Sequence, residues 1–302
     1  MLTNMLTKED THKQMFTMGH SGCSGCSQTM AVRLITEVLG KNTIATSATG
    51  CLEVISAKFP ESSWNIPWIH SLFENSAAVA SGIEAALQIT GKKEGITVLA
   101  QAGDGGTADI GLQALSGMFE RNHDLLYVCY DNGAYMNTGY QRSGLTPYDA
   151  FTSTSPSGKI SFGNNRPKKY MPEIAMAHRI PYTAVASVGY PMDLQKKVKK
   201  TMSIKGSKYL QVDVPCTPGW KYEPRYSVKI AQLGVQSGLY PLFEAEYDKI
   251  ISVKKIGKKV PVEEYLKLQG RFKHLFKDEA GKAEIEKIQK IADENIERYG
   301  LL

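Results

Sequence analysis

The amino-acid sequence predicts an α/β protein with a doubly wound, mostly parallel sheet. Two observations indicate this fold. Short apolar segments alternate with segments of helical periodicity, and turns rich in Gly, Asp and Asn stand where the apolar segments end. The chain has 302 residues, of which 42% are hydrophobic, so it can bury a substantial core in one large domain or in two smaller ones.

The alternation continues from residue 27 to about residue 214. Helices are expected over 27–40, 72–90, 108–120, 172–178 and 192–202. Buried strands are expected over 43–47, 96–101, 125–130, 182–188 and 209–214. Because strands joined through helices pair in parallel, their carboxyl ends meet at one edge of the sheet, and that edge is where such folds bind ligands.

Three segments stand outside this alternation. The polar start, 1–17, is expected to be an N-terminal arm that is loose over 1–14. The main domain then covers 18–240. It contains a stretch rich in Ser, Thr, Gly and Pro over 139–172, and loops of that length are usually functional or cover a partner. The charged segment 241–302 is expected to be a helical C-terminal extension that packs on partner subunits.

Charge and hydropathy narrow the class of function. The sequence has no run of 18 apolar residues and no charged-then-apolar leader, so we expect a cytoplasmic protein without a membrane segment. The 36 Lys and Arg residues exceed the 30 Asp and Glu residues, which gives a net charge of +6. Short lysine runs at 196–200 and 254–259 favour solvated faces, with a docking patch for an acidic redox partner as the alternative. No motif indicates nucleic-acid binding.

A turn with the sequence Gly103-Asp104-Gly105 follows the strand expected at 96–101. Asp104 offers the hard anionic oxygen that Mg²⁺ prefers, and the flanking glycines let the backbone approach a diphosphate and tolerate positive φ. The helix expected from Ala108 would direct free N–H groups at the same anion.

Asn132 stands 28 residues after Asp104 (132 − 104), beyond one helix and one strand, which brings it to the neighbouring strand end. The Asn132 side-chain oxygen and the Ala134 carbonyl can complete a metal shell there. This spacing resembles the signature for thiamine diphosphate bound through Mg²⁺. A plain turn is the alternative for Gly-Asp-Gly alone, and the strand–turn–helix–strand context with Asn132 favours the cofactor site.

Five cysteines in such a chain argue against a disulfide scaffold and for metal or redox chemistry. Cys23 and Cys26 form a C-x-x-C pair, and Cys51 and Cys216 lie in separate Gly- or Pro-containing turns. One pair with two scattered cysteines favours a [4Fe–4S] cluster over structural Zn²⁺, which usually draws on two close pairs. Zinc and cysteines without a metal remain alternatives. Cys129, inside the apolar segment LLYVCY, is expected to be a small buried side chain.

These features together resemble the β subunits of 2-oxoacid:ferredoxin oxidoreductases, most closely those of the pyruvate:ferredoxin (pyruvate synthase) type. The resemblance covers roughly residues 18–225, and several of its stretches are highly specific. The stretches are GHSGCSGC, TGCLEV, PWIHSLFENSAAVASGIEAA, GDGGTADIGLQALSGMFERNHDLLYVCYDNGAYMNTGYQRS, TPYDAFTSTSPSGK and VPCTPGW.

The resemblance implies a thiamine diphosphate-binding fold of the pyrophosphate type and a role for each matching residue. Four cysteines would ligate a proximal [4Fe–4S] cluster, namely Cys23, Cys26, Cys51 and Cys216. Asp104, Asn132 and the Ala134 carbonyl would hold Mg²⁺, and Gly103, Gly105 and Thr138 would contact the cofactor. Asn137 would lie against the thiazolium and donate to the developing oxyanion of a 2-oxoacid adduct. A turn-stabilising Asn in a loop is the alternative reading of Asn137.

The resemblance further implies half of an active site. The resemblance places the glutamate that protonates N1′ of the aminopyrimidine on an α subunit. Glu74 and Glu84 of this chain are expected in a packed helix. Subunits of α, γ and δ type, ferredoxin as electron acceptor, coenzyme A as co-substrate and pyruvate as the 2-oxoacid are the implied partners. Oxalate and 2-oxoglutarate are alternative substrates, and a non-catalytic iron–sulfur or zinc module is the alternative from another class.

The sequence departs from the family pattern at two places. Ser27-Gln28 stands where an acidic pair often follows the second cysteine, so no role is assigned to Gln28. Gly144-Leu145 replaces a more usual Ser- or Ala-containing pair, which leaves substrate contacts from that loop open.

Overall fold

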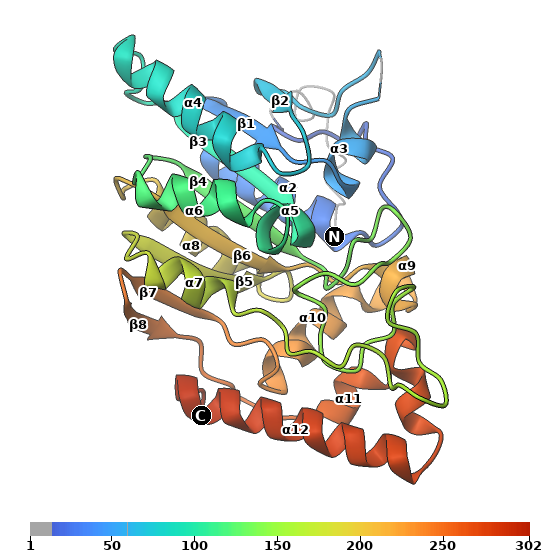
Figure 1. Ribbon diagram of the computed structural model, residues 1–302. Helices are drawn as coiled ribbons and strands as arrows, with labels where there is room; N and C mark the ends of the chain where they lie inside the picture. Colours follow the sequence, from blue (N-terminus) through green and yellow to red (C-terminus); the bar gives the residue numbers. More distant parts are fainter. Residues whose placement is uncertain (1–13, 59) are drawn as a thin grey trace, which may run out of the picture.

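The computed structural model describes residues 14–58 and 60–302, so residues 1–13 of the expected arm lie outside the described part. The described residues form an eight-stranded sheet with the order β2-β1-β3-β4-β6-β5-β7-β8 (Figure 1). Strands β1 to β6 pair in parallel, and β7 and β8 continue the sheet antiparallel from β5. The strands are β1 (Thr43–Ser47), β2 (Trp68–His70), β3 (Thr97–Gly103), β4 (Leu126–Asp131), β5 (Tyr182–Ser187), β6 (Lys208–Asp213), β7 (Phe243–Glu246) and β8 (Lys249–Val253). The predicted α/β fold with a mostly parallel sheet is confirmed.

Helices cover both faces of this sheet. One face packs against α2 (Ser27–Leu39), α8 (Pro191–Thr201) and α10 (Ser227–Gln236). The other packs against α4 (Ser76–Ile89), α6 (Leu112–Glu120) and α7 (Met171–Ala177), which lie in front of the sheet in Figure 1. All six residues of each of β4, β5 and β6 are buried, as expected for strands covered on both faces.

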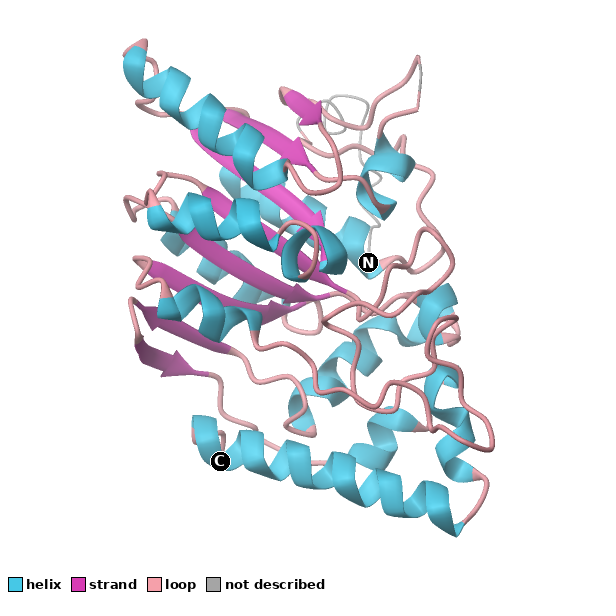
Figure 2. Ribbon diagram, in the orientation of Figure 1, coloured by secondary structure: helices cyan, strands magenta, loops and turns pink. Residues whose placement is uncertain are grey.

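The loops and short helices that follow the parallel strands gather at the edge toward which the strand arrows point (Figure 2). Three short helices lie there, namely α3 (Cys51–Ser56), α5 (Asp104–Ala108) and α9 (Thr217–Trp220). The residues predicted for both sites lie at this edge.

One predicted helix is wrong in its extent. The helix expected over 108–120 begins only at Leu112 as α6, and a turn at 109–111 separates it from the short helix α5. A Cβ at Gly111 would stand 1.8 Å from the carbonyl oxygen of Gly106, so the turn is too tight for any other residue. The helix that follows β3 begins at Asp104 itself and not near Ala108. Helix α4 likewise begins at Ser76, four residues later than predicted.

The end of the predicted N-terminal arm is part of the main domain. Phe16 is fully buried and forms an antiparallel bridge with Trp64. The two rings meet edge to face with centroids 4.9 Å apart. The boundary predicted after residue 17 is therefore too late, because the chain already packs on the core at Phe16.

The predicted C-terminal extension, 241–302, is only partly helical. Its first residues form β7 and β8, which belong to the sheet. Helices α11 (Val262–Leu266), η2 (Gly270–Phe276) and α12 (Glu279–Tyr299) follow. Asp278 caps α12 by accepting a hydrogen bond of 2.9 Å from the Gly281 amide, and Gly300 ends the helix with φ 57°. Side chains of these helices pack on this chain's own domain.

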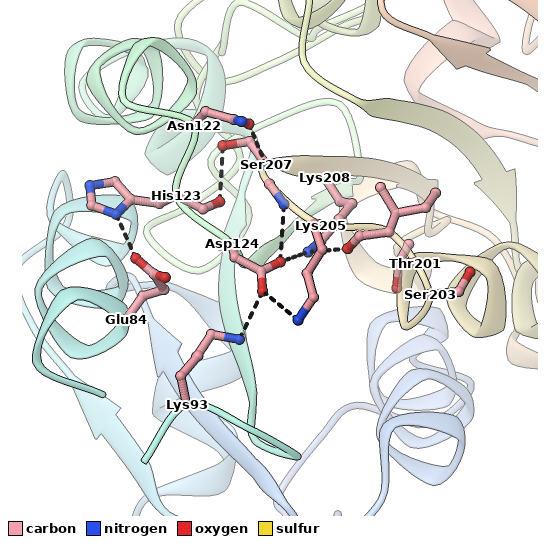
Figure 3. Close-up of polar contacts among 12 residues, drawn as sticks. Glu84, Lys93, Asn122, His123, Asp124, Thr201, Ser203, Lys205, Ser207 and Lys208 are labelled. Atoms are coloured by element: carbon pink, nitrogen blue, oxygen red, sulfur yellow. Dashed lines mark hydrogen bonds and ion pairs between the residues drawn. The ribbon is translucent and has the colours of Figure 1, made fainter. Parts of the chain in front are cut away.

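Asp124 connects three strands at the opposite edge of the sheet, where the parallel strands begin. Its carboxylate pairs with Lys93 at 3.1 Å and with Lys208 at 2.6 Å, and Lys205 approaches to 3.8 Å (Figure 3). These contacts join the starts of β3, β4 and β6.

Among the described helices, none combines the length and apolar character needed to span a membrane.

Candidate functional site

Two turns meet at the carboxyl ends of β3 and β4. Gly103 pairs with Tyr130 in the parallel register, so Asp104 and Asn132 come next on neighbouring strands. The Asn132 backbone amide donates a hydrogen bond of 3.0 Å to Oδ1 of Asp104. The Ser143 hydroxyl donates one of 2.8 Å to Oδ2 of the same carboxylate. The predicted proximity of Asp104 and Asn132 is therefore present in the structure.

Asp104 is only 2% exposed, and its surroundings favour a neutral acid in the absence of a cation. Burial raises the pKa of Asp104 above its usual range, and repulsion from Asp131 raises it further. Hydrogen bonds from Asn132 and Ser143 oppose this pKa shift without cancelling it. A cation at this position would favour the ionised form.

The seven residues predicted to contact the cofactor or its metal line a single cavity. They are Gly103, Asp104, Gly105, Asn132, Ala134, Asn137 and Thr138. The first five come from the ends of β3 and β4, whereas Asn137 and Thr138 are exposed on the loop that follows. A carboxylate, a carboxamide oxygen and a backbone carbonyl are the hard ligands that Mg²⁺ takes, so this donor set fits the metal.

The glycines of this turn serve close approach and not positive φ, which corrects one expectation. Gly103 has φ −83°, and Gly105 is absent from the positive-φ residues. A Cβ at Gly105 would stand 2.0 Å from the Tyr135 ring, so no side chain fits there. A Cβ at Gly103 would meet nothing nearer than the Tyr130 carbonyl oxygen at 3.9 Å. Gly103 thus leaves free space in the cavity for a ligand.

The four cysteines predicted to bind a cluster line a second cavity of about 200 Å³. Cys26 stands directly before α2, Cys51 is the first residue of α3, and Cys216 stands directly before α9. Cys23 lies in the loop that leads to α2. Three of the four cysteines therefore stand at or directly before the first residue of a helix.

The cysteines interact with each other electrostatically. Burial raises the pKa of Cys51 to about 12, with further increases from Cys26 and Cys23. Burial also raises the pKa of Cys216 to about 12. A metal centre that binds thiolates would reverse this preference for the thiol.

The four cysteine side chains leave the metal open. In the described part of the chain, no three His, Cys, Asp or Glu side chains are grouped closely enough to hold one metal ion. Thiolates around a single Zn²⁺ lie about 2.3 Å from the metal and therefore close together. A cubane cluster holds its thiolates further apart. Four cysteines around one cavity supply the thiolates that either a [4Fe–4S] cluster or zinc can take.

The two cavities share part of their lining. Five residues border both of them, namely Gln28, Cys51, Asn132, Met136 and Asn137. A group in the cavity of Asp104 and a group in the cavity of the cysteines would therefore be separated by single side chains. This arrangement is suited to electron transfer between two cofactors.

Sequence reasoning did not identify Ser143, Asp109 and Tyr135 as parts of the site. Ser143 contacts Asp104, and the Tyr135 hydroxyl donates a hydrogen bond of 2.8 Å to Asp109. Asp109 in turn accepts one of 2.9 Å from the Gly144 amide. All three lie inside the resembling stretch that starts with GDGG, which is the one signal that could have identified them.

The pair Gly144-Leu145 has a structural explanation. A Cβ at Gly144 would stand 2.6 Å from Oδ1 of Asp109, and Leu145 is fully buried.

Cys129 is also fully buried in the core between sheet and helices, as predicted.

No glutamate is among the described residues that line the cavity of Asp104. Glu84 lies in α4 as expected, where it pairs with His123 at 2.8 Å near the opposite edge of the sheet (Figure 3). Glu74 was expected in the same helix but precedes its first residue, Ser76.

Comparison with protein families identifies a thiamine-binding domain. Residues 48–212 match the model described as "Thiamine pyrophosphate enzyme, C-terminal TPP binding domain". The matched segment includes Gly103-Asp104-Gly105, Asn132 and Cys51.

Curated relatives match nearly the whole chain. The pyruvate synthase subunit PorB of Methanosarcina barkeri is 54% identical over 96% of this chain and 98% of its own length. The PorB subunit of Methanocaldococcus jannaschii is 50% identical over 98% of this chain and 100% of its own length. The ketoisovalerate oxidoreductase subunit VorB of Pyrococcus abyssi is 46% identical over 95% of this chain and 92% of its own length.

A solved structure shares the fold. The 2-oxoglutarate:ferredoxin oxidoreductase of Magnetococcus marinus superimposes with a TM-score of 0.57 at 22% identity, over 76% of this chain and 81% of that one.

Proposed function

The chain belongs to the 2-oxoacid:ferredoxin oxidoreductase family that includes the PorB subunits of pyruvate synthase, and from this premise we propose that it is the thiamine- and cluster-binding β subunit of a pyruvate:ferredoxin oxidoreductase. The reaction is the coenzyme A-dependent oxidative decarboxylation of pyruvate to acetyl-CoA and CO₂, coupled to reduction of ferredoxin. The reaction can run toward pyruvate when reduced ferredoxin is abundant. The pyruvate synthase relatives support pyruvate as the substrate, with identities of 50% and 54%.

One observation carries the proposal: the same five residues line both the cavity of Asp104 and the cavity of the four cysteines. When bound, thiamine diphosphate supplies the carbanion and electron sink for decarboxylation, and a [4Fe–4S] cluster accepts electrons one at a time. The protein's part is to hold the two groups side by side and to exclude water.

The residues of this chain divide that work. Asp104, Asn132 and the Ala134 carbonyl hold Mg²⁺, and the free backbone space at Gly103 admits the diphosphate. Ser143 and the Asn132 amide fix the Asp104 carboxylate by hydrogen bonds of 2.8 and 3.0 Å. Those two bonds fix the orientation of the Asp104 side chain, which lowers the cost of ordering it on the metal.

Asn137 is the residue of this chain that we assign to the substrate. It is exposed and borders both cavities. Its carboxamide can donate a hydrogen bond to the oxygen of a 2-oxoacid as negative charge develops there. Thr138 stands next to it, and its hydroxyl donates to Gln141 at 2.6 Å, which holds the loop.

The other half of the site comes from partners. We propose that an α-type subunit supplies the glutamate for N1′, because no described glutamate lines the cofactor cavity. The complex would further contain γ- and δ-type subunits, with coenzyme A as co-substrate and ferredoxin as acceptor. The subunit designation of the PorB relatives supports a multi-subunit enzyme.

A branched-chain 2-oxoacid is the second candidate substrate. The VorB relative, named for ketoisovalerate, is 46% identical over 95% of this chain. This value is close to those of the pyruvate synthase relatives.

The test is purification of the complete complex followed by cofactor analysis and an activity panel. We expect iron, acid-labile sulfide, Mg²⁺ and thiamine diphosphate, with activity on pyruvate, coenzyme A and a low-potential acceptor exceeding that on 2-oxoisovalerate, 2-oxoglutarate and oxalate. A zinc protein without thiamine, or a complex inactive on every 2-oxoacid, would overturn the proposal.

Asp104→Asn is the matched variant for this test. It keeps the side-chain shape and removes the charge, so Mg²⁺ and thiamine diphosphate should be lost while iron and sulfide remain. Asp248→Asn is the control, because Asp248 is half exposed in a turn of the β7–β8 hairpin. Simultaneous loss of cluster and thiamine in Asp104→Asn would contradict two separable sites.

A further inference from the structure

The lining shared by the two cavities contains two side chains that have no role so far. Of its five residues, Cys51, Asn132 and Asn137 are assigned to the cluster, the metal and the substrate. Gln28 and Met136 remain, and they are only 6% and 7% exposed. Both side chains therefore stand between the cavities and not at the surface.

Met136 forms the apolar part of this wall. A Cβ at Gly219 would stand 2.2 Å from the Met136 sulfur and 3.3 Å from the Cys216 sulfur, so the thioether packs directly beside a cluster cysteine. Met136 also belongs to the apolar cluster that includes Trp220, Cys51 and Cys216. A flexible, polarisable side chain of this kind fills an irregular gap and excludes water from it.

Gln28 forms the polar part. It is the second residue of α2, which begins directly after Cys26. In the described part of the chain no hydrogen bond to its carboxamide is found, although the side chain is more than nine-tenths buried. The carboxamide is not among the fully enclosed polar atoms without a partner, so it faces a cavity that it borders and can hydrogen-bond a group bound there.

We propose that Gln28 and Met136 form a partition that sets the reduction potential of the proximal cluster. Gln28 donates a hydrogen bond toward the cluster sulfurs, which favours the reduced, more negative state. Met136 excludes water that would otherwise hydrate the same sulfurs. Hydrogen bonds and solvent exposure are two of the means by which a protein tunes an iron–sulfur centre. The partition is itself neither oxidised nor reduced, and the inference rests on the proposed function.

The test is a redox titration of the complete complex, in which electron paramagnetic resonance monitors the reduced clusters. The proximal cluster is identified as the signal that is missing from a complex with Cys216→Ser. Gln28→Leu removes the donor and should shift the midpoint potential to more negative values. Gln28→Glu, of equal size, also adds negative charge and should shift the potential further in the same direction.

Substitutions of Met136 test the opposite shift of the midpoint potential and supply the matched control. Met136→Ala opens the wall to water and should raise the midpoint potential, whereas Met136→Leu keeps the apolar volume and should leave the potential unchanged. A purely structural role would alter cluster content or melting temperature without these opposed shifts. If a variant does not assemble the cluster, the size-conserving changes Gln28→Glu and Met136→Leu still decide the question, because only the first should move the potential.

The outcomes distinguish a failure of the proposed function from a failure of the partition formed by Gln28 and Met136. A wild-type complex without an iron–sulfur signal overturns the proposed function itself. A wild-type complex with the signal, and with the same potential in Gln28→Leu, Gln28→Glu and Met136→Ala, overturns the partition alone.

Discussion

The indole N–H of Trp220 donates a hydrogen bond of 2.6 Å to the backbone carbonyl of Asn132. Trp220 ends helix α9, which begins directly after Cys216. One bond therefore connects the segment of a proposed cluster ligand with the turn of a proposed Mg²⁺ ligand. The Arg271 guanidinium, from η2 in the C-terminal extension, stacks 3.6 Å from the centre of the Trp220 ring. The C-terminal extension thus contacts the site through the packing of Arg271 on Trp220.

Trp220→Phe should weaken cofactor binding through this connection. The ring remains, but the Asn132 carbonyl loses its donor in a buried position, which costs about 1–3 kcal/mol. We expect a lower melting temperature together with a higher dissociation constant for thiamine diphosphate in the presence of Mg²⁺, measured by calorimetry on the complex.

Trp64→Phe is the matched control for this loss. The Trp64 indole N–H donates a hydrogen bond of 2.8 Å to the Ser56 hydroxyl, away from the Asp104 cavity. A comparable loss of stability is expected with unchanged cofactor affinity. Equal effects of both substitutions on affinity would show that Trp220 acts through general stability only.

Asp213 should make stability depend on pH. Burial raises the pKa of Asp213 to about 7, with a further increase from Asp131, while Lys168, a hydrogen bond from Ser187 and Arg271 oppose the shift. The folded state therefore holds a proton that the unfolded state releases near pH 4. Stability therefore falls as pH rises from about 4 to about 7, and this loss is complete above pH 7.

Asp213→Asn removes this titration. The variant should be more stable than the wild type at pH 8, and the difference should shrink toward pH 5, in urea unfolding of the full-length chain at both values. A difference that is constant with pH, or that grows toward pH 5, would contradict a raised pKa.

The sequence predicted the parts of the site that follow from the order of strands. Asp104 and Asn132 end consecutive buried strands, and parallel pairing then makes them neighbours. The meeting of Cys216 with Cys23 was implied by resemblance and not by spacing, because their separation of 193 residues (216 − 23) contains no local signal. Ser143 was missed for the same reason, since its return to Asp104 depends on the fold of a long loop.

The errors in the fold have local causes. Strand β2 was missed because it has three residues, and none is fully buried. The hairpin of β7 and β8 was interpreted as part of a helical tail, because β8 carries an exposed row of residues at the sheet edge and gives no buried-strand signal. The break at 109–111 depends on the contact of Gly111 with the Gly106 carbonyl, which no propensity describes.

Cys216→Ser should reduce cluster content, because serine replaces one of four thiolates with a poorer ligand for iron. The measurement is iron and acid-labile sulfide per complex. Cys129→Ala is the control within the same chain, since Cys129 is fully buried in β4 and lines neither cavity. Its expected effect is a modest loss of stability with full cluster content. Full content in Cys216→Ser would remove Cys216 from the ligand set.

Gly105→Ala should abolish retention of thiamine diphosphate and Mg²⁺. The new methyl group would stand 2.0 Å from the Tyr135 ring, which cannot move without breaking the 2.8 Å hydrogen bond from its hydroxyl to Asp109. The displaced ring or turn would shift Asp104 from its position.

Gly82→Ala is the matched control, because Gly82 lies in α4 with nothing within 4 Å of the added Cβ. That change should stabilise the chain by roughly 0.5–1 kcal/mol, as alanine does in place of glycine in a helix, and leave cofactor content unchanged. Thiamine content after gel filtration, compared with melting temperature, separates the two effects, and full retention of thiamine in Gly105→Ala would mean that the turn tolerates a side chain.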